Sequence, residues 1–151
     1  MYLTRFSDVG LRIMMYLSKE QRETPSVTIA EIAQQFDIPR NHVVKITARL
    51  VKSGWVHSTR GRTGGLRLAM APSEIRIGQV IRLLENREEL IQCESLNCRL
   101  SSHCGLRSVL KIALDRFYAA LDEHTLQDIT ANRTGDAIMK IQQAYVAQIG
   151  R

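Results

Sequence analysis

Three cysteines are the side chains of this 151-residue chain that are best suited to chemistry, and they lie close together in the sequence. Four residues separate Cys93 from Cys98, and five separate Cys98 from Cys104. An odd number of clustered thiols does not fit the disulfide framework of a secreted protein, whereas it fits a metal or redox site. Thiolates are soft ligands that bind zinc or iron-sulfur clusters in preference to magnesium or calcium.

The spacing of the cysteines favours an iron-sulfur cluster over zinc. Structural zinc sites usually contain a close Cys-x-x-Cys pair, and this chain has none. Iron-sulfur clusters accept wider spacing, but a cubane cluster needs four ligands, so the fourth must be a residue other than cysteine or come from another chain. His103 is the nearest local candidate. The alternative is that the three cysteines are reduced thiols without a ligand.

Two helices are expected on either side of the cysteines, so that the thiolates converge from a loop. Apolar residues at helical spacing predict one helix over 77–85 and a longer one over 105–124. The longer helix has an apolar seam along five turns, formed by Leu106, Val109, Leu110, Ala113, Phe117, Ala120 and Leu121. Such a seam belongs either to a buried core or to the pairing helix of a symmetric dimer.

The positive charge of the chain is concentrated in its first half. Residues 1–70 contain eleven Lys and Arg but five Asp and Glu, whereas residues 71–151 contain ten of each kind, and the net charge is +6. Between residues 40 and 67 there are seven basic residues and no acidic one. This asymmetry is typical of a protein that binds a phosphate backbone, although a solvated basic surface is the alternative.

Helix signals in the first half predict a helix-turn-helix. Helices are expected over 4–19, where Thr4 caps the first turn, and over 29–36, where Thr28-Ile29-Ala30-Glu31 has the form of a reciprocal capping box. Asp37-Ile38-Pro39 ends the second helix, and Pro39 suits the first turn of a third helix over 39–53. Two helices joined by a short turn make this motif.

The third helix is expected to read DNA. Its apolar residues gather on one side, while short polar and cationic residues gather on the other, an arrangement that suits the major groove. An ordinary amphipathic surface helix is the alternative. The predicted apolar side comprises Val43, Ile46, Thr47, Leu50 and Val51, and the predicted DNA contacts in this helix are Arg40, Asn41, His42, Lys45 and Arg49.

A β-hairpin is expected after the third helix. Alternating runs at 55–59 and 66–68 flank the glycine-rich segment 60–65, which predicts two strands and a flexible tip. Arg60, Arg62 and Arg67 would contact phosphates or a minor groove. The glycines do not form a nucleotide-binding loop, because the Lys-Ser/Thr ending is missing. The fold class is therefore mainly α with a small β-hairpin wing: a winged helix-turn-helix domain plus a long dimerisation helix.

Other features bound the class of protein and its domains. An apolar fraction of 44% allows a core, and 5% aromatic residues argue against an all-β sandwich. No membrane span or signal peptide is evident, so a cytoplasmic protein is expected. No histidine lies near a convincing nucleophile or acid-base pair, so no enzyme is expected. The expected parts are a DNA-binding domain at 1–70, a cysteine loop and dimerisation helix at 71–129, and an amphipathic tail at 130–151 that begins with a polar linker.

Taken in order, these motifs resemble the family of winged-helix iron-sulfur transcriptional regulators. The resemblance covers about residues 1–129 and rests on Leu3-Thr4, the segments 40–45 and 60–68, and the Cys-x4-Cys-x5-Cys spacing before a long helix. Within this family the chain looks most like the nitric-oxide-sensing repressors. The related regulators of iron-sulfur biogenesis carry a histidine three residues after the third cysteine, where this chain has Arg107.

The resemblance implies a homodimer with one 4Fe-4S cluster per subunit, or alternatively a 2Fe-2S cluster. The three cysteines of one subunit and a carboxylate near the start of the first helix of the other would hold it, and Asp8 matches that carboxylate. Arg12 and Glu85 match family residues close to the cluster. Without the resemblance, Asp8 is explained by the favourable interaction of a negative charge with the helix dipole.

The function implied by the resemblance is that of a repressor bound to an inverted-repeat operator, which it releases when nitric oxide reacts with the cluster. One alternative is a regulator of the same family that senses iron-sulfur status, iron or redox stress. The other is a small zinc-binding module that interacts with nucleic acid or protein.

Overall fold

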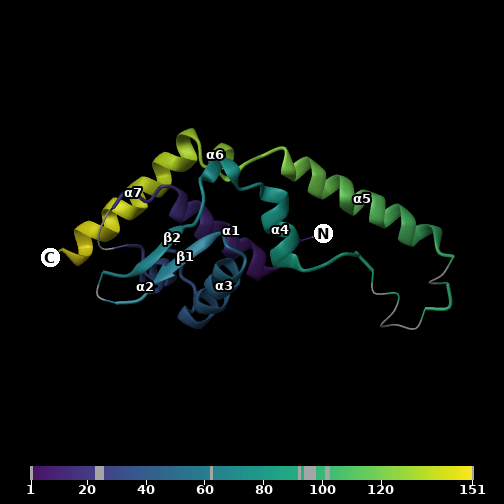
Figure 1. Cartoon of the computed structure of the whole chain (residues 1–151), viewed down its shortest axis with the longest axis horizontal. Coiled ribbons are helices and arrows are strands. Elements are labelled where there is room, and N and C mark those ends of the chain that lie inside the picture. Colours follow the sequence, from purple (N-terminus) through teal and green to yellow (C-terminus); the bar gives the residue numbers. More distant parts are fainter. Residues whose placement is uncertain are drawn as a thin grey trace.

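A computed structural model describes residues 2–22, 26–61, 63–91, 93, 98–100 and 103–150. The described part is mostly helical with one antiparallel hairpin, which confirms the predicted fold class (Figure 1). The elements are α1 (Arg5–Ser18), α2 (Ile29–Gln35), α3 (Arg40–Lys52), β1 (Val56–Thr59), β2 (Gly65–Leu68), the 3-10 turn η1 (Pro72–Glu74), α4 (Ile77–Glu85), α5 (Gly105–Asp122), α6 (Leu126–Ile129) and α7 (Asn132–Ile149). Within these described residues, no helix has the length and apolar character needed to cross a membrane.

Helix α1 lies at the centre of the fold and packs against α3, α4, α6 and β2. Its first turn is capped as predicted, because the Thr4 hydroxyl accepts a hydrogen bond from the Ser7 amide at 3.2 Å. Ile13 and Met14 are fully buried. Gly10 permits the close approach of α4, since a Cβ atom at this position would lie 2.6 Å from Leu84 Cδ1.

Helices α2 and α3 form the helix-turn-helix, and the N-terminus of α2 differs from the predicted capping box. Thr28 Oγ1 accepts from the Glu31 amide at 3.1 Å, as expected. The Glu31 carboxylate does not reach back to residue 28, so that half of the prediction is wrong. It is buried instead and accepts hydrogen bonds from Tyr16 Oη at 2.6 Å and Arg22 Nη2 at 2.8 Å, because a buried carboxylate needs strong donors.

The hairpin is joined to the helical body along one strand. Strand β1 pairs with β2 in a register that places Val56 opposite Leu68 and Thr59 opposite Gly65. Val56 and Leu66 are buried, and the Leu66 amide donates to the Val27 carbonyl at 2.7 Å. Strand β2 is therefore held by the segment that precedes α2.

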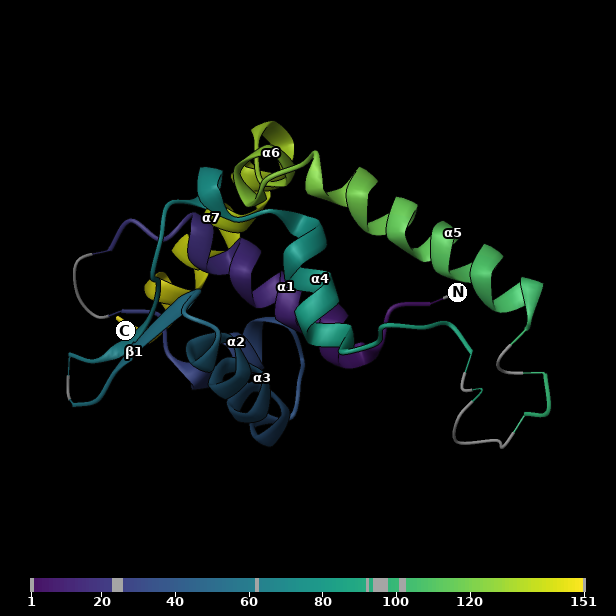
Figure 2. The ribbon, with the colours of Figure 1, turned by 45° about the vertical axis from the view of Figure 1, so that its right-hand side comes forward.

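The second half of α5 packs against α4, whereas its first half projects from the body of the molecule (Figures 1 and 2). At this contact, Gly78 of α4 lies so close to the Tyr118 carbonyl that a Cβ atom would collide with it. Leu114 and Tyr118, in the second half of α5, are buried. In the first half, Leu106 is 61% exposed, Val109 is 62% exposed and Ile112 is 53% exposed.

The C-terminal region corrects the expectation of a polar linker at 130–135. Residues 126–129 form α6, which begins with a capping box between Thr125 and Asp128, and α7 starts at Asn132. Thr130 is fully buried because its hydroxyl donates to the Leu126 carbonyl at 2.7 Å. Helix α7 then packs against α2, and its Gln142 Nε2 donates to the Tyr16 carbonyl of α1 at 2.9 Å. This region is therefore part of the folded body.

Candidate DNA interface and cysteine site

Helix α3 presents a polar face to the outside because its apolar residues pack against α1 and α2. Val43, Ile46 and Leu50 are buried. The exposed residues of the opposite face are Arg40, Asn41, His42 and Lys45, and Arg49 is half-buried. Val51, predicted on the apolar side, is 37% exposed because it lies at the edge of that sector in the last turn.

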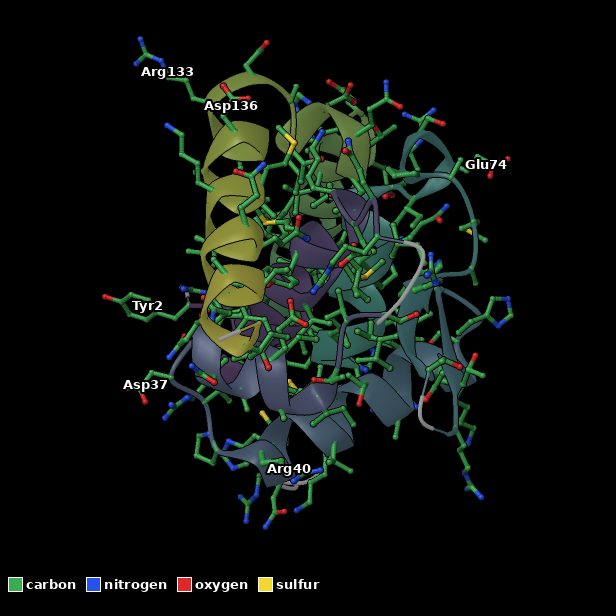
Figure 3. The ribbon with its side chains drawn as sticks, turned by 90° about the vertical axis from the view of Figure 1, so that its left-hand side faces the viewer. Tyr2, Asp37, Arg40, Glu74, Arg133 and Asp136 are labelled. Carbon is green, nitrogen blue, oxygen red and sulfur yellow. The ribbon has the colours of Figure 1, made fainter. Side chains whose placement is uncertain are left out.

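The cations of this face have no partners in the described part of the chain. Arg40, Lys45, Arg49 and Arg60 make no ion pair or side-chain hydrogen bond with any described residue. In Figure 3, Arg40 extends from the body into the surroundings. Unpaired guanidinium and ammonium groups on one helix and an adjacent hairpin provide the electrostatic basis for phosphate contacts. Arg62, also predicted to contact DNA, lies outside the described residues.

Arg67 differs from the other predicted DNA contacts. Its backbone is in β2, and its guanidinium donates to Ser26 Oγ at 3.1 Å and to the Arg22 carbonyl at 2.9 Å. It therefore fastens the hairpin to the segment before α2. This structural role was not visible in the sequence, because the two acceptors lie more than forty residues away.

The three cysteines are free thiols that are electrostatic neighbours of one another. Cys93 is buried, and its carbonyl accepts from the Cys98 amide at 3.1 Å. Burial raises the pKa of the Cys93 thiol, Cys98 and Cys104 raise it further, and Arg107 opposes them. The local donor set of three soft sulfur ligands thus fits a cluster of soft metal ions.

The ligand set is incomplete within one described chain. Among the described residues, no group of three or more Cys, His, Asp or Glu side chains is arranged to hold a metal ion. His103, the local candidate for a fourth ligand, is exposed, and its amide donates to the Leu100 carbonyl at 3.0 Å. The three cysteines are electrostatic neighbours, but even their own sulfur atoms are not arranged as a metal-binding group in the described part of the chain.

An ion pair spans the cysteine segment. Arg107 Nε donates to Glu89 Oε1 at 3.0 Å, and both side chains are about one-third exposed. Glu89 precedes the first cysteine and Arg107 follows the last, so the pair closes the root of the segment. The sequence contained no signal for Glu89, because nothing in the spacing distinguished it from Glu88.

Asp8 lies in the first turn of α1, where one of its oxygens is paired. Asp8 Oδ1 accepts from Arg12 Nε at 2.9 Å, and both side chains are about half exposed. The other oxygen has no partner among the described residues. The start of α5, which follows Cys104, lies away from α1 in both ribbon views (Figures 1 and 2). Asp8 and the cysteines of the same chain are therefore not brought together.

Glu85 connects the start of α1 with the end of α4. Its Oε1 atom accepts from the Thr4 amide at 2.7 Å and from Thr4 Oγ1 at 3.0 Å. Burial acts to raise the pKa of Glu85, but hydrogen bonds from Ser7 and Thr4 outweigh it and lower the pKa below the ordinary value. Glu85, the last residue of α4, is thus hydrogen-bonded to Thr4, which caps the turn of α1 that carries Asp8.

Comparisons with known proteins agree with this geometry. The chain is 41% identical over 144 residues to the HTH-type transcriptional regulator NsrR of Bacillus licheniformis, covering 93% of this chain and 99% of the relative. It is 39% identical over 144 residues to NsrR of Bacillus subtilis strain 168, covering 93% and 97%. These relatives regulate transcription and are not enzymes, which confirms the expectation that this chain is not an enzyme.

Solved structures show the same fold. The global cysteine regulator CymR of B. subtilis has a TM-score of 0.67 and 26% identity, over 87% of this chain and 97% of that one. T. potens IscR has a TM-score of 0.66 and 26% identity, over 85% of each chain. The model of the Rrf2 family, described as iron-dependent transcriptional regulators, matches residues 3–132. This DNA-binding chain therefore belongs to the Rrf2 family of transcriptional regulators.

Proposed function

We propose that the chain is an iron-sulfur-dependent repressor that senses nitric oxide and leaves its operator when the cluster ligation is lost. The observation that carries this proposal is the presence of a basic face on α3 and three neighbouring free thiols, where the described residues supply neither partners for the basic face nor a fourth ligand for the thiols. Its identity with relatives named NsrR supports the choice of signal.

The proposed repressor is a homodimer paired through α5. Leu106, Val109 and Ile112 form an apolar face that the described residues of one chain leave in water. A second copy covers such a face on both subunits at once, because a two-fold interface is self-complementary. We assign residues 71–129 to cluster binding and pairing, and residues 1–70 to DNA binding.

Cys93, Cys98 and Cys104 of one subunit and Asp8 of the partner subunit are the proposed ligands. Asp8 suits this role because it is about half exposed, carries an oxygen without a partner in the described chain, and belongs to α1, which lies away from the start of α5 that follows the cysteines. A 4Fe-4S cluster is proposed, with 2Fe-2S as the alternative, and it supplies iron atoms that react with nitric oxide. Arg12, paired with Asp8, would neighbour this site.

Glu85 is the residue that links ligation to DNA binding within each subunit. It joins the C-terminal end of α4, which leads into the cysteine segment, to the start of α1, and α1 packs directly on α3. A shift of the cysteine segment or of Asp8 therefore acts on the helix that positions the recognition helix. The two recognition helices of the dimer must match two half-sites of an inverted repeat, so a change in their separation weakens binding.

Arg40, Asn41, His42, Lys45 and Arg49 of α3 are the proposed contacts in the major groove. Arg60 and Arg62 of the hairpin would contact the phosphate backbone or the minor groove, and Arg67 would do so only while also holding the hairpin base. The repressor is proposed to act in the cytoplasm.

Anaerobic purification tests the cofactor, and nitric oxide tests the signal. The purified protein should be brown with broad visible absorption, and a colourless protein containing zinc would rule out the cluster. An operator is then selected from random duplexes, and its affinity is measured before and after stoichiometric nitric oxide. A loss of about 5- to 150-fold is expected, the usual range of allosteric coupling. Unchanged affinity would contradict nitric oxide as the signal and would favour the alternative, a regulator of the same family that senses another signal.

Asp8→Ala tests the ligand from the partner. The variant should fold but change the visible spectrum or its rate of bleaching by nitric oxide. Asp136→Ala is the matched control, since Asp136 is also an exposed carboxylate on a helix (Figure 3). A spectrum and bleaching rate identical to those of the parent protein would remove Asp8 from the ligand set.

A further inference from the structure

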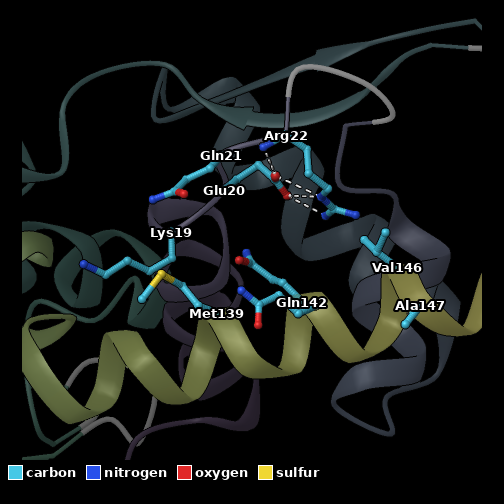
Figure 4. Close-up of a pocket in the computed structure, with 9 residues that line it drawn as sticks. Lys19, Glu20, Gln21, Arg22, Met139, Gln142, Val146 and Ala147 are labelled. Atoms are coloured by element: carbon cyan, nitrogen blue, oxygen red, sulfur yellow. Dashed lines mark hydrogen bonds and ion pairs between the residues drawn. The ribbon is translucent and has the colours of Figure 1, made fainter.

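A cavity of about 450 Å³ lies between α7 and the turn at residues 19–22, in a part of the fold that the proposed DNA and cluster sites do not use (Figure 4). It is at the opposite end of the molecule from the projecting part of α5 (Figure 1). Its lining consists of Lys19, Glu20, Gln21, Arg22, Met139, Gln142, Gln143, Val146 and Ala147.

The wall formed by the turn contains a network of charged side chains that are largely buried. Glu20 accepts from the Arg22 amide at 2.6 Å and from Arg22 Nε at 2.9 Å, and its side chain is 4% exposed. Arg22 also reaches the buried Glu31, which Tyr16 holds from the other side. Hydrogen bonds to Glu20 raise the pKa of Arg22, against the effect of burial, so its guanidinium stays charged.

Two of the side chains that line this cavity, Lys19 and Arg22, are cations, and the glutamines of the lining carry amide groups that both donate and accept. Arg22 Nη1 is buried and has no hydrogen-bond partner. The Lys19 ammonium has no acidic partner among the described residues. Gly135 of α7 leaves room for it, since a Cβ atom there would lie 3.2 Å from Lys19 Nζ. Glu20 is the acidic residue of the described lining, and both of its oxygens are occupied by Arg22. An acceptor or anion therefore complements this lining.

The opposite wall is largely apolar. Met139, Val146 and Ala147 come from one side of α7, and Gln142 lies between them with its amide nitrogen engaged by the Tyr16 carbonyl. Figure 4 shows Lys19 and Met139 at one end of the cavity and Val146 and Ala147 at the other. The volume is within the range of cavities that hold small organic ligands. The occupant that fits has an anionic end and an apolar body.

We propose that this cavity binds a small organic carboxylate, with the carboxylate beside Lys19 and the apolar body against α7. The Arg22 carbonyl, on the same turn, accepts from Arg67 of β2, so the turn that an occupant would contact also holds this strand of the hairpin. The proposal does not depend on the cluster, and it gives the chain a second ligand site at the end remote from the cysteines.

Nuclear magnetic resonance of methyl-labelled methionine in the full chain tests the proposal, with 4-phenylbutyrate and its neutral amide as the paired probes. The Met139 methyl signal should shift saturably with 4-phenylbutyrate, with a Kd of about 1 mM or below. The signals of buried Met14 and remote Met70 serve as internal references. The amide should bind at least about tenfold more weakly, because it lacks the charge that Lys19 recognises.

Lys19→Gln should remove the preference for the acid over the amide, whereas Lys140→Gln, an exposed lysine of α7 outside the lining, should leave it intact. Ala147→Trp, which fills the cavity from an exposed position, should abolish the Met139 shift for both probes. Equal binding of acid and amide to the parent protein, no saturable Met139 shift, or the same shift in Ala147→Trp would overturn the proposal.

Discussion

The DNA-reading region and the cysteine region of this chain are completed to different degrees. In the first, α1 is surrounded by α3, α4, α6 and β2, and the apolar sides of its helices are buried within one chain. In the second, half of α5 projects with its apolar residues exposed, and three thiols lack a fourth ligand among the described residues. A single chain therefore suffices to fold the DNA-reading region, whereas the proposed cluster site requires a second chain and a cofactor.

The charges of the two regions differ in the same way. Arg40, Lys45 and Arg60 have no partner in the described chain, which leaves them available to another molecule. In the cysteine region, Arg107 is paired with Glu89, and Lys111 is paired with Asp115. Cations that are paired within the chain stabilise their own helix or loop, while the unpaired cations gathered on α3 and the hairpin create the field that attracts DNA. The differences in packing and in charge pairing between the two regions can each be tested by substitution.

The largest effect is expected on assembly. Val109→Asp combined with Ile112→Asp should weaken self-association by at least about 100-fold, because two apolar side chains of the interface are replaced by charges that resist burial. Sedimentation velocity over a series of protein concentrations measures the change. Ile141→Asp, at a partly exposed apolar position of α7, is the control and should not alter assembly. Unchanged sedimentation of the double variant would show that this face is not the interface.

The next effect concerns DNA. Arg40→Ala combined with Lys45→Ala should lower affinity for the selected operator by about 10- to 100-fold and reduce the slope of log K against log salt by up to about 2, because the interface loses two cations. Fluorescence anisotropy at several salt concentrations provides the measurement. Arg116→Ala removes an exposed cation of α5 and should leave both quantities unchanged. An equal loss in that control would contradict the division of charge between the regions.

A smaller effect is expected where the two regions meet. Glu85→Gln weakens the charge-assisted hydrogen bonds to Thr4 and should lower the free energy of unfolding by about 1–2 kcal/mol at neutral pH. Because the pKa of Glu85 is lowered in the folded state, its contribution is present above the ordinary value of 4.5 and is lost as the pH falls through the folded value. The difference between variant and parent should therefore shrink in acid.

Urea unfolding at neutral and acidic pH measures the contribution of Glu85. Glu88→Gln is the matched control, since Glu88 is an exposed neighbour without a partner in the described chain. A difference that stays constant down to strongly acidic pH would show that the carboxylate charge is not what holds α4 to α1.

The smallest effect is expected at the root of the cysteine segment. Arg107→Gln should lower the free energy of unfolding of the metal-free chain by less than about 1 kcal/mol, because the ion pair with Glu89 is partly exposed. The effect should disappear at about 1 M salt, where such pairs are screened. Urea unfolding at low and high salt, in a double-mutant cycle with Glu89→Gln, gives the pair energy. A loss above about 2 kcal/mol would place this pair among the main supports of the fold.

Local signals in the sequence predicted most helix ends and the basic face. The Thr4 hydroxyl caps α1 as expected, and Gly54, with φ of 78°, follows the end of α3. Exceptions arose where a distant residue competed for a side chain. The Glu31 carboxylate accepts hydrogen bonds from Tyr16 and Arg22 instead of capping α2. Arg67 of the hairpin donates to acceptors in the segment before α2.

The sequence by itself determined the periodicity of the helices, the separation of the basic and apolar faces of α3, and the clustering of three thiols. These properties depend on residues a few positions apart, for which helical geometry fixes the neighbours. Only the tertiary structure decided that α7 packs against α1 and α2, that Glu85 ties the end of α4 to the start of α1, and that the start of α5, which follows the cysteines, lies away from α1. Those arrangements join residues distant in sequence, whose pairing depends on how the whole core closes.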